Sequence, residues 1–280
     1  MTTAAPPTRY LDLAHGRIAY DDTADTADTG TGTGARVVVC VPGLGDIRGV
    51  YRHLRPLLTG AGYRVVTMDL RGAGESSAPW PDYSTTAVAS DVLALVRHLD
   101  AGPVVLLGNS YTGGASLVAA AEAGEDFAGL VLTAPFARRR PRERLLVRLA
   151  LTVVGRSPFA WVAYWSSLFT GGKPADFAAA KKALRASLRE PGHMAALRSM
   201  LAAGQAPGEA AAPQVRCPVL VVMGDADPDF PDPAVEADAV ANLVPDGTVA
   251  VIEGCGHYPA AEAPGETAAV VLPFLRKVMG

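Results

Sequence analysis

The segment around Ser110 constrains the fold of this chain more than any other. The apolar run Val-Val-Leu-Leu at 104–107 leads into Gly-Asn-Ser, and an alanine-rich stretch follows. This order predicts a buried strand, a sharp turn and a helix. Such a turn exposes a serine hydroxyl beside a helix N-terminus, which stabilises a developing oxyanion. Because the turn is strained, its neighbours must be small. Gly108 meets that demand fully, and Thr112 meets it in part.

A serine nucleophile needs a base, and the base needs an acid that orients it. His257 follows an apolar run near the C-terminus. Between the serine and this histidine, another apolar run ends in a turn that contains Asp225 and Asp227. Catalytic groups of open α/β sheets gather at the edge formed by the carboxyl ends of the strands. We therefore expect Ser110, His257 and one of the two aspartates to meet at that edge.

A glycine loop is expected to complete this site. The apolar run at 36–41 leads into Pro-Gly-Leu-Gly at 42–45. A loop of this kind can offer a backbone N–H to an oxyanion, and the N–H that follows the nucleophile can serve as the second donor. The donors predicted here are the N–H groups of Leu44 and Tyr111. The glycine-rich segment 69–77 is expected to form a tight loop beside the site.

Strand and helix patterns alternate through most of the chain. Nearly continuous apolar runs are typical of strands that are buried on both faces of a parallel sheet. We predict an α/β fold with a mostly parallel, eight-stranded sheet and flanking helices. The expected strands are 9–13, 17–21, 36–41, 64–68, 103–107, 129–133, 218–223 and 248–252, and the expected helices are 49–59, 84–99, 111–123, 233–242 and 264–278.

Residues 136–212 break this alternation. They are helical in composition and are divided by prolines, which suit helix starts. We predict a helical cap subdomain at 136–212, inserted into a core formed by 1–135 and 213–280, with 205–213 as the return linker. Residues 22–35 have low complexity and no apolar pattern, so we predict a flexible hairpin loop there.

Five segments, in this order, resemble the α/β-hydrolase fold superfamily, in the form of capped, single-domain serine hydrolases such as esterases and carbon–carbon bond hydrolases. They are Pro-Gly-Leu-Gly, Asp-Leu-Arg-Gly-Ala-Gly-Glu-Ser, Gly-Asn-Ser-Tyr-Thr-Gly-Gly, Met-Gly-Asp-Ala-Asp-Pro and Gly-Cys-Gly-His-Tyr-Pro. By position, the resemblance implies Ser110 as nucleophile, His257 as base and Asp227 as acid. Asp225 fits less well, because the acid of this family usually stands three residues after the glycine of its turn. The resemblance also implies the two N–H donors named above.

Two positions depart from the pattern of this superfamily. Pro42 stands where many relatives carry a histidine, which predicts a reshaped oxyanion loop. Thr112 replaces the last glycine of the usual Gly-x-Ser-x-Gly turn, which predicts an altered turn geometry. Dehalogenases and epoxide hydrolases of this superfamily place an aspartate at the turn, where this chain has Ser110.

Aromatic residues are the candidates for the substrate pocket. Trp161 and Trp165 lie in the cap region, and Tyr258 follows the expected base. Lining an apolar pocket and packing the cap onto the core explain the cap aromatics equally well. The arginines between Arg138 and Arg148 form a basic cluster that could steer a carboxylate or dock an acidic acyl carrier. A solvated helix face is the more common role of a charge run, and we favour that interpretation.

Three functional hypotheses follow. The first is a cofactor-independent serine hydrolase acting on an ester, lactone or thioester of a small, largely apolar molecule. The second is carbon–carbon bond hydrolysis of a diketone, because Gly-Asn-Ser resembles the turn of such hydrolases and Arg185, Arg189 or Arg198 could hold a carboxylate. The third is a non-hydrolytic ligand-binding protein, isomerase or cyclase, since the fold is reused for these roles. Loss of absorbance from a diketone separates the first two, and tight binding without an acyl-enzyme indicates the third.

Composition limits the kinds of molecule that this protein is expected to bind. The net charge of −3 argues against nucleic acid, and no run approaches the roughly 18 apolar residues of a membrane helix. We expect a small-molecule substrate and no cofactor, and no metal site, because His and Cys do not occur at ligand spacing. The N-terminal residues do not resemble a signal peptide. Cys40, Cys217 and Cys255 are interpreted as buried, reduced thiols, which predicts a cytoplasmic protein.

Overall fold

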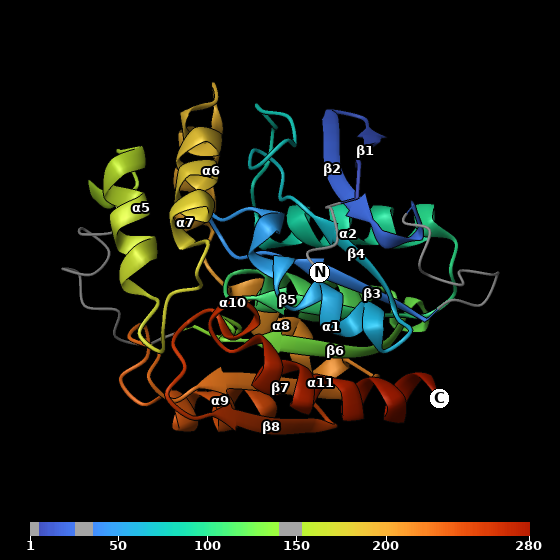
Figure 1. The fold of residues 1–280 in the computed structure, drawn as a ribbon. Coiled ribbons are helices and arrows are strands. Elements are labelled where there is room, and N and C mark those ends of the chain that lie inside the picture. The colour runs from blue at the N-terminus through green and yellow to red at the C-terminus, as the bar shows by residue number, and fades with distance from the viewer. Residues whose placement is uncertain (1–5, 26–35, 140–152) are drawn as a thin grey trace.

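The computed structural model describes residues 6–25, 36–139 and 153–280. Its centre is one eight-stranded sheet with the order β1-β2-β4-β3-β5-β6-β7-β8 (Figure 1). β2 is antiparallel to β1 and to β4, and all other neighbours are parallel. Every expected strand is present, and the predicted α/β fold class is confirmed. The strands are β1 Thr8–Leu13, β2 Gly16–Asp22, β3 Val37–Val41, β4 Arg64–Met68, β5 Val104–Asn109, β6 Phe127–Thr133, β7 Val219–Gly224 and β8 Gly247–Ile252.

Polar side chains begin several of the helices. Ser84, Ser157 and Asp232 each accept a hydrogen bond from a backbone N–H in the first turn of the helix that follows, and so satisfy a donor that the helix itself leaves unpaired. The helices are α1 Arg55–Gly60, α2 Thr85–Leu99, α3 Thr112–Glu122, α5 Pro158–Ser167, α6 Phe177–Arg189, α7 His193–Ala203, α8 Ala206–Ala211, α9 Pro233–Ala241, α10 Pro259–Glu262 and α11 Pro264–Met279, with short 3-10 helices η1 Thr23–Asp25, η2 Arg48–Arg52, η3 Gly124–Asp126 and η4 Ala212–Gln214.

The two faces of the sheet are buried by different helices. In β3, Val37, Val39 and Val41 belong to one apolar core, and Val38 and Cys40 belong to the other. This division follows from the two-residue period of a strand. Helices α2, α3 and α9 close the first core, whereas α1 and α11 close the second. Burial on both faces explains why these strands are nearly continuous apolar runs in the sequence.

Helices α5, α6 and α7, which we call the cap helices, lie at the end of the sheet toward which β7 and β8 run (Figure 1). Polar contacts join α6 and the residue before it to the rest of the chain. The N–H of Gly74 donates to Ser187 Oγ at 2.9 Å. The guanidinium of Arg52 binds the carboxylate of Asp176, which precedes α6, through two contacts of 2.7 Å. The glycine-rich segment 69–77 therefore supports a cap helix.

The expected linker at 205–213 is instead helical for most of its length. It contains α8, which packs against α3. The close approach depends on glycine, because a Cβ placed on Gly208 would lie 2.6 Å from the Cα of Gly114. The alanine content of this segment favours a helix, and Pro207 near the start of α8 is compatible with one.

Two other expectations are corrected at their boundaries. The expected flexible loop at 22–35 does not begin at residue 22, because Asp22 is buried and binds the guanidinium of Arg64 on β4 at 2.6 Å. Residues 26–35 lie outside the described part of the chain. The expected helix at 49–59 is divided into η2 and α1, because Pro56 at the start of α1 lacks the N–H that a continuous helix needs.

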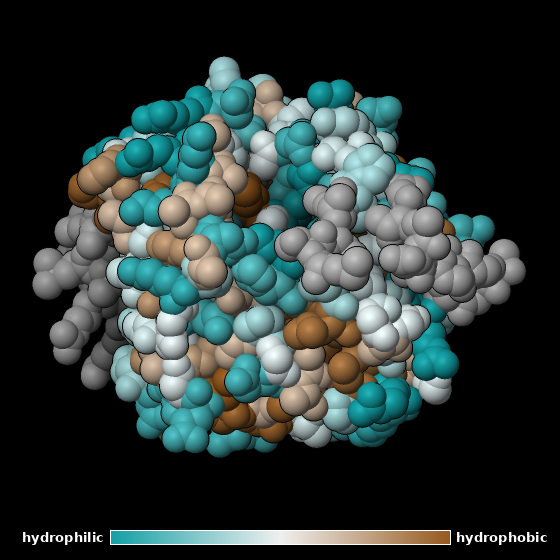
Figure 2. Space-filling view, in the orientation of Figure 1, coloured by the Kyte–Doolittle hydropathy of each residue, from teal (hydrophilic) through white to brown (hydrophobic). Residues whose placement is uncertain are grey.

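The described part of the surface carries no large apolar area on the face that Figure 2 draws. Polar and apolar side chains are interspersed over the described part of the face in Figure 2, and the apolar ones form small separate groups. No helix among the described residues is both long enough and apolar enough to cross a lipid bilayer.

The contact between α8 and α3 gives a test of the fold. We expect Gly208→Ala to lower the free energy of unfolding by about 1–3 kcal/mol, because the added methyl group meets the backbone of Gly114. Gly265→Ala is the matched control, since a Cβ at this helical position meets nothing within 4 Å. Chemical denaturation of both variants measures the difference, and equal stabilities would contradict the predicted close packing.

Candidate active site

Ser110 lies in the sharp turn between β5 and α3, with a left-handed backbone at φ 56°. This conformation is uncommon for a residue with a side chain and is held by its surroundings. The N–H of Ser110 donates to the carbonyl of Thr133 on β6 at 2.9 Å. Gly108 is required beside the turn, because a Cβ there would lie 2.5 Å from Ser116 Oγ. The hydroxyl is thus carried on a strained turn between a strand and a helix.

The structure brings Ser110, His257 and Asp227 together. Ser110 Oγ lies 2.9 Å from His257 Nε2, and His257 Nδ1 lies 2.6 Å from Asp227 Oδ2. The three residues come from the turns after β5, β8 and β7, and none is more than 7% exposed. Asp225 does not join them. It is exposed, and its carboxylate accepts the N–H of Gly254 at 2.7 Å.

Nearby charges and burial shift the pKa of His257 in opposite directions. Burial lowers its pKa, but the negative charge of Asp227, the hydrogen bond to Asp227 and the charges of Asp229 and Glu262 outweigh that effect. The pKa of His257 is therefore raised above its ordinary value. A neutral imidazole in this position accepts a proton readily.

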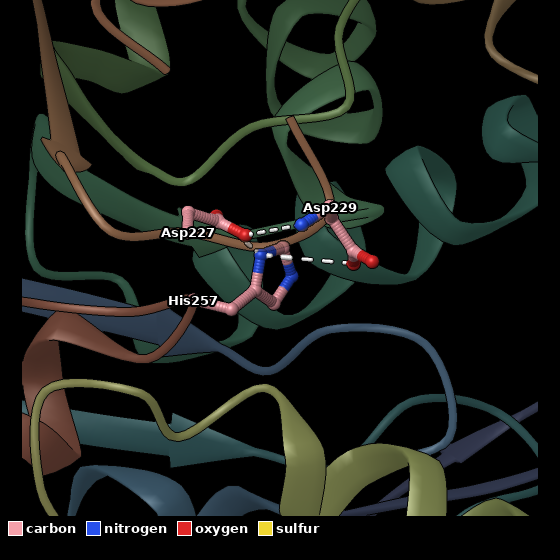
Figure 3. A group of neighbouring side chains, drawn as sticks. All are labelled: Asp227, Asp229 and His257. Carbon is pink, nitrogen blue, oxygen red and sulfur yellow. Dashed lines mark hydrogen bonds and ion pairs between the residues drawn. The ribbon is translucent and has the colours of Figure 1, made fainter. Parts of the chain in front are cut away.

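Asp229 belongs to the same cluster, and the sequence analysis did not identify it. Figure 3 shows its carboxylate beside the His257 ring, with 3.9 Å between Asp229 Oδ2 and His257 Nδ1. Its backbone N–H donates to Asp227 Oδ1 at 2.9 Å. The only signal in the sequence is a third aspartate in one turn, and a sequence does not reveal which aspartate of a turn faces the histidine.

These three side chains are also the kind of cluster that can bind a metal ion. Two ligands at tetrahedral angles on a zinc ion lie roughly 3.3 Å apart. The Nδ1 atom of His257 and the carboxylate of Asp227 are closer than that, at 2.6 Å. This distance fits a direct hydrogen bond between the two groups rather than joint coordination of a metal ion.

The glycine loop after β3 lies against the serine. A Cβ placed on Gly43 would be 2.9 Å from the Cβ of Ser110. The carbonyl of Gly45 accepts the indole N–H of Trp161 at 2.8 Å, so α5 holds the loop. Within the described ranges, the N–H groups of Leu44 and Tyr111 have no hydrogen-bond acceptor. Both predicted donors remain available to a ligand.

Thr112 fits the turn through its hydroxyl group. Thr112 Oγ1 lies 2.8 Å from the carbonyl oxygen of Asn109 and 3.1 Å from that of Val41. The side chain is 1% exposed and begins α3. The hydroxyl therefore connects the turn to the end of β3, just before the buried Pro42. In this chain a threonine contact replaces the glycine of the usual pattern.

Asn109 binds the protein framework beside the serine. Its Nδ2 atom donates to the carbonyl and the hydroxyl of Thr133, at 3.1 and 3.0 Å, and lies 3.4 Å from the carbonyl of His257. The side chain is 3% exposed. Asn109 therefore connects the serine turn to β6 and to the histidine loop.

A cavity of about 430 Å³ opens above Ser110 and His257. All three aromatic residues singled out in the sequence are part of its wall. They are also packed, since Trp161, Trp165 and Tyr258 are each no more than 4% exposed. The cavity is lined by Leu44, Ser110, Tyr111, Phe136, Arg138, Arg139, Trp161, Tyr164, Trp165, Leu168, Met200, Leu201, Gly204, Gln205, Asp229, His257 and Tyr258.

The arginines suggested for carboxylate binding by a diketone hydrolase do not line this cavity. Arg185, Arg189 and Arg198 are not among its lining residues. The guanidinium of Arg185 instead lies over the ring of Phe159, and that of Arg198 lies 3.4 Å from the carbonyl of Gly155. A helix presents side chains on all sides of its axis. The presence of an arginine in a helical segment therefore does not show whether that arginine faces the pocket.

Arg138 and Arg139 line the cavity, and both have partners. The guanidinium of Arg138 binds the carboxylate of Glu236 at 2.6 Å, and that of Arg139 binds Glu209 at 3.1 Å. Arg138 is therefore not part of a freely solvated face. The rest of the basic cluster, from residue 140 to Arg148, lies outside the described residues.

The cysteine thiols lack the exposure and the lowered pKa of an activated nucleophile. Cys40, Cys217 and Cys255 are all buried, and none of them forms a disulfide. Burial raises the pKa of Cys217 to about 11 and raises the pKa of the other two thiols as well. A thiol must lose its proton to attack, so Ser110 is the better placed nucleophile.

Comparison with known proteins gives one family and several partial relatives. Residues 38–270 match the model of a family described as the alpha/beta hydrolase family. The chain is 30% identical to bifunctional epoxide hydrolase 2 of Sus scrofa over 116 residues, which cover 40% of this chain and 21% of that protein. It is 34% identical to a probable esterase of Oryza sativa subsp. japonica over 106 residues, which cover 36% of this chain and 39% of that protein. The aligned part therefore spans well under half the length of either relative.

A solved structure matches over nearly the whole chain. A thermophilic esterase from Thermogutta terrifontis aligns with a TM-score of 0.78 and 25% identity, over 98% of this chain and 100% of that one. This match covers the sheet, the helices on both faces and the cap helices together.

The Thr112 contact can be tested directly. We expect Thr112→Val to lower the free energy of unfolding by about 1–2 kcal/mol, because it keeps the volume of the side chain and removes a buried hydrogen bond. Thr112→Ser keeps the hydroxyl and should retain most of that bond energy. Denaturation curves of both variants measure the effect. A valine variant more stable than the serine variant would show that volume, and not the hydroxyl, matters here.

Proposed function

Since this chain belongs to the alpha/beta hydrolase family, we propose that it is a serine hydrolase that cleaves an ester, lactone or thioester of a small, largely apolar molecule. One observation carries the proposal: Ser110 Oγ, the His257 ring and the Asp227 carboxylate form a continuous line of contacts of 2.9 and 2.6 Å. A purely ligand-binding protein has no physical need for this series of groups in a buried site.

The geometry supports nucleophilic attack by Ser110. His257 Nε2 is within hydrogen-bond distance of Ser110 Oγ and takes its proton as the oxygen attacks the substrate carbonyl. Asp227 accepts the hydrogen on Nδ1, which fixes the tautomer of the ring and stabilises its positive form. The N–H groups of Leu44 and Tyr111 are the proposed donors to the oxyanion.

The same groups complete the first half of the reaction and then carry out the second. The imidazolium of His257 gives its proton to the leaving alcohol or thiol, and an acyl group remains on Ser110. In the second half, a water molecule gives a proton to His257 and attacks the acyl carbonyl. His257 then returns that proton to Ser110 Oγ as the acid leaves, which restores both the serine and the neutral imidazole. No cofactor is required for either half.

The cavity supports a small and largely apolar substrate. Its volume of about 430 Å³ is of the size of common ligand pockets. Trp161, Trp165 and Tyr258 present aromatic surface in it, and they suit an acyl or alcohol part that contains a ring or a branched chain. The esterase names of two of the similar proteins support the same class of bond.

The epoxide hydrolase similarity does not favour epoxide opening here. An enzyme of that type attacks with an aspartate carboxylate at the turn, and this chain presents Ser110. The carbon–carbon bond hypothesis has weaker support than ester hydrolysis. The three arginines that could have held a carboxylate do not line the cavity, and Asn109 binds Thr133.

Active-site labelling tests the proposed nucleophile. We expect a fluorophosphonate to add once to the wild-type protein, because His257 activates Ser110, and not to Ser110→Ala. His257→Ala should react far more slowly, by about three orders of magnitude or more. Intact-protein mass spectrometry measures the adduct. A folded wild-type protein that stays unlabelled would contradict the serine hydrolase proposal and favour a non-hydrolytic role.

The raised pKa of His257 predicts the pH dependence. The base must be neutral, so kcat/KM should fall as the pH decreases through the pKa of His257 in the free enzyme. That pKa is raised, which places the acid limb above the ordinary histidine value of about 6.5. Hydrolysis of 4-nitrophenyl acetate across the neutral range measures the limb. A limb below the ordinary value would contradict the predicted charge balance.

A further inference from the structure

The carboxylate of Asp229 lies between the cap and the groups of the proposed reaction. Asp229 lines the cavity, and its side chain is 16% exposed. The backbone N–H of Asp229 donates to Asp227 Oδ1 at 2.9 Å, while the other oxygen of Asp227 faces the His257 ring. Both oxygens of the Asp227 carboxylate are therefore held, and one of them is held by Asp229.

The opposite side of Asp229 contacts a cap helix. The hydroxyl of Tyr164, on α5, lies 2.9 Å from each carboxylate oxygen of Asp229. The ring of Tyr164 packs edge-on against Trp161, with 5.4 Å between ring centres. Both rings line the cavity. A substrate that fills the cavity would therefore lie beside the residues to which Asp229 is bonded.

We propose that Asp229 is a positioning residue: its backbone N–H holds the Asp227 carboxylate, and its own carboxylate supports the charged form of His257 and connects it to Tyr164 of the cap. This inference rests on the proposed function and adds a component to it. Asp229 makes no covalent bond and transfers no proton in this scheme. It acts through Asp227 and His257, and the Tyr164 hydroxyl fixes its carboxylate at the required place.

The charged groups around His257 define what Asp229 can contribute. Asp227 and Asp229 face the ring from the loop after β7, and Glu262 faces it from α10. Glu262 is engaged elsewhere, because its carboxylate accepts the backbone N–H groups of Tyr258 and Gly256 at 2.9 and 3.2 Å. Arg138 and Arg139 line the same cavity but are bound to glutamates.

Aromatic rings surround much of the buried His257 ring. The rings of Phe136, Phe230 and Tyr258 pack within 5.2 to 6.2 Å of the His257 ring, measured between centres. Charges interact more strongly with a buried group than with one in open solvent, and His257 is only 2% exposed. A second carboxylate at 3.9 Å from Nδ1 therefore raises the pKa of His257, and its removal should lower that pKa.

The key variant is Asp229→Asn, which keeps the shape and the backbone N–H and removes the charge. We expect the acid limb of kcat/KM to move down by about 0.5–1 pH unit, and kcat to fall several-fold with a smaller change in KM. Asp229→Glu restores the charge and should return the limb toward the wild-type position. Asp225→Asn is the matched control, because it removes a carboxylate from the same turn without a contact to His257.

A double-mutant cycle tests the connection to the cap. Tyr164→Phe removes only the hydroxyl that binds Asp229. If the hydroxyl acts through Asp229, the double variant Tyr164→Phe with Asp229→Asn should be no slower than Asp229→Asn alone. Fully additive losses would overturn the proposed connection.

A titration without substrate separates this inference from the proposed function. The ring proton resonance of His257, assigned with His257→Gln, can be followed by NMR in wild type, Asp229→Asn and Asp225→Asn. We expect a lower pKa of His257 in Asp229→Asn alone. If the resonance responds in this way but wild type hydrolyses no ester, the proposed function fails, whereas the effect of the Asp229 charge on His257 is confirmed. If esters are hydrolysed and neither the resonance nor the acid limb responds to Asp229→Asn, the positioning role is wrong and the hydrolase proposal stands.

Discussion

The parallel register of the strands β3, β5, β6, β7 and β8 is the constraint on which the site depends. Asn109 pairs with Thr133, and Gly224 pairs with Ile252, so these strands end at nearly the same level. Their following turns meet because parallel strands share one carboxyl edge. Ser110, Asp227 and His257 lie 30 to 147 residues apart in sequence, and the ladder hydrogen bonds between the strands bring their turns to one edge. Helices on both faces of the sheet exclude water from these bonds and make the register rigid.

The site also requires backbone segments to approach one another closely, and glycine residues allow this. Gly43 lies against Ser110, Gly108 lies against Ser116, and Gly208 lies against Gly114. At each position, even one added carbon would displace a neighbour. The turn at Ser110 is strained in itself, and the bond from its N–H to Thr133 helps to hold it. Thr112 shows that glycine is not the only solution, because a hydroxyl that bonds locally fits where a bare backbone is usual.

Much of the fold was predictable from local patterns. Each of the eight strands was expected to within two residues at either end, because strands buried on both faces are short, continuous apolar runs. The position of Ser110 after such a run was equally clear. Three features were not predictable in this way. The segment 205–213 contains a helix, Arg138 and Arg139 line the cavity whereas Arg185, Arg189 and Arg198 do not, and Asp229 lies beside His257. Each depends on which way a side chain points or on what packs against it, and neither is encoded in local spacing.

The sequence by itself determined the class of fold and the chemical types at its functional edge. Periodicity and the order of strands and turns are local properties, and a single chain displays them directly. Only the tertiary structure determined which of these residues contact one another. It placed the carboxylate of Asp227, the aspartate that the resemblance already favoured, 2.6 Å from His257 Nδ1. It also left two N–H donors of the described residues without acceptors and enclosed the serine under aromatic residues of α5. The physical reason is that hydrogen bonds and ion pairs act over a few ångströms in space, between residues whose separation along the chain carries no information about their distance.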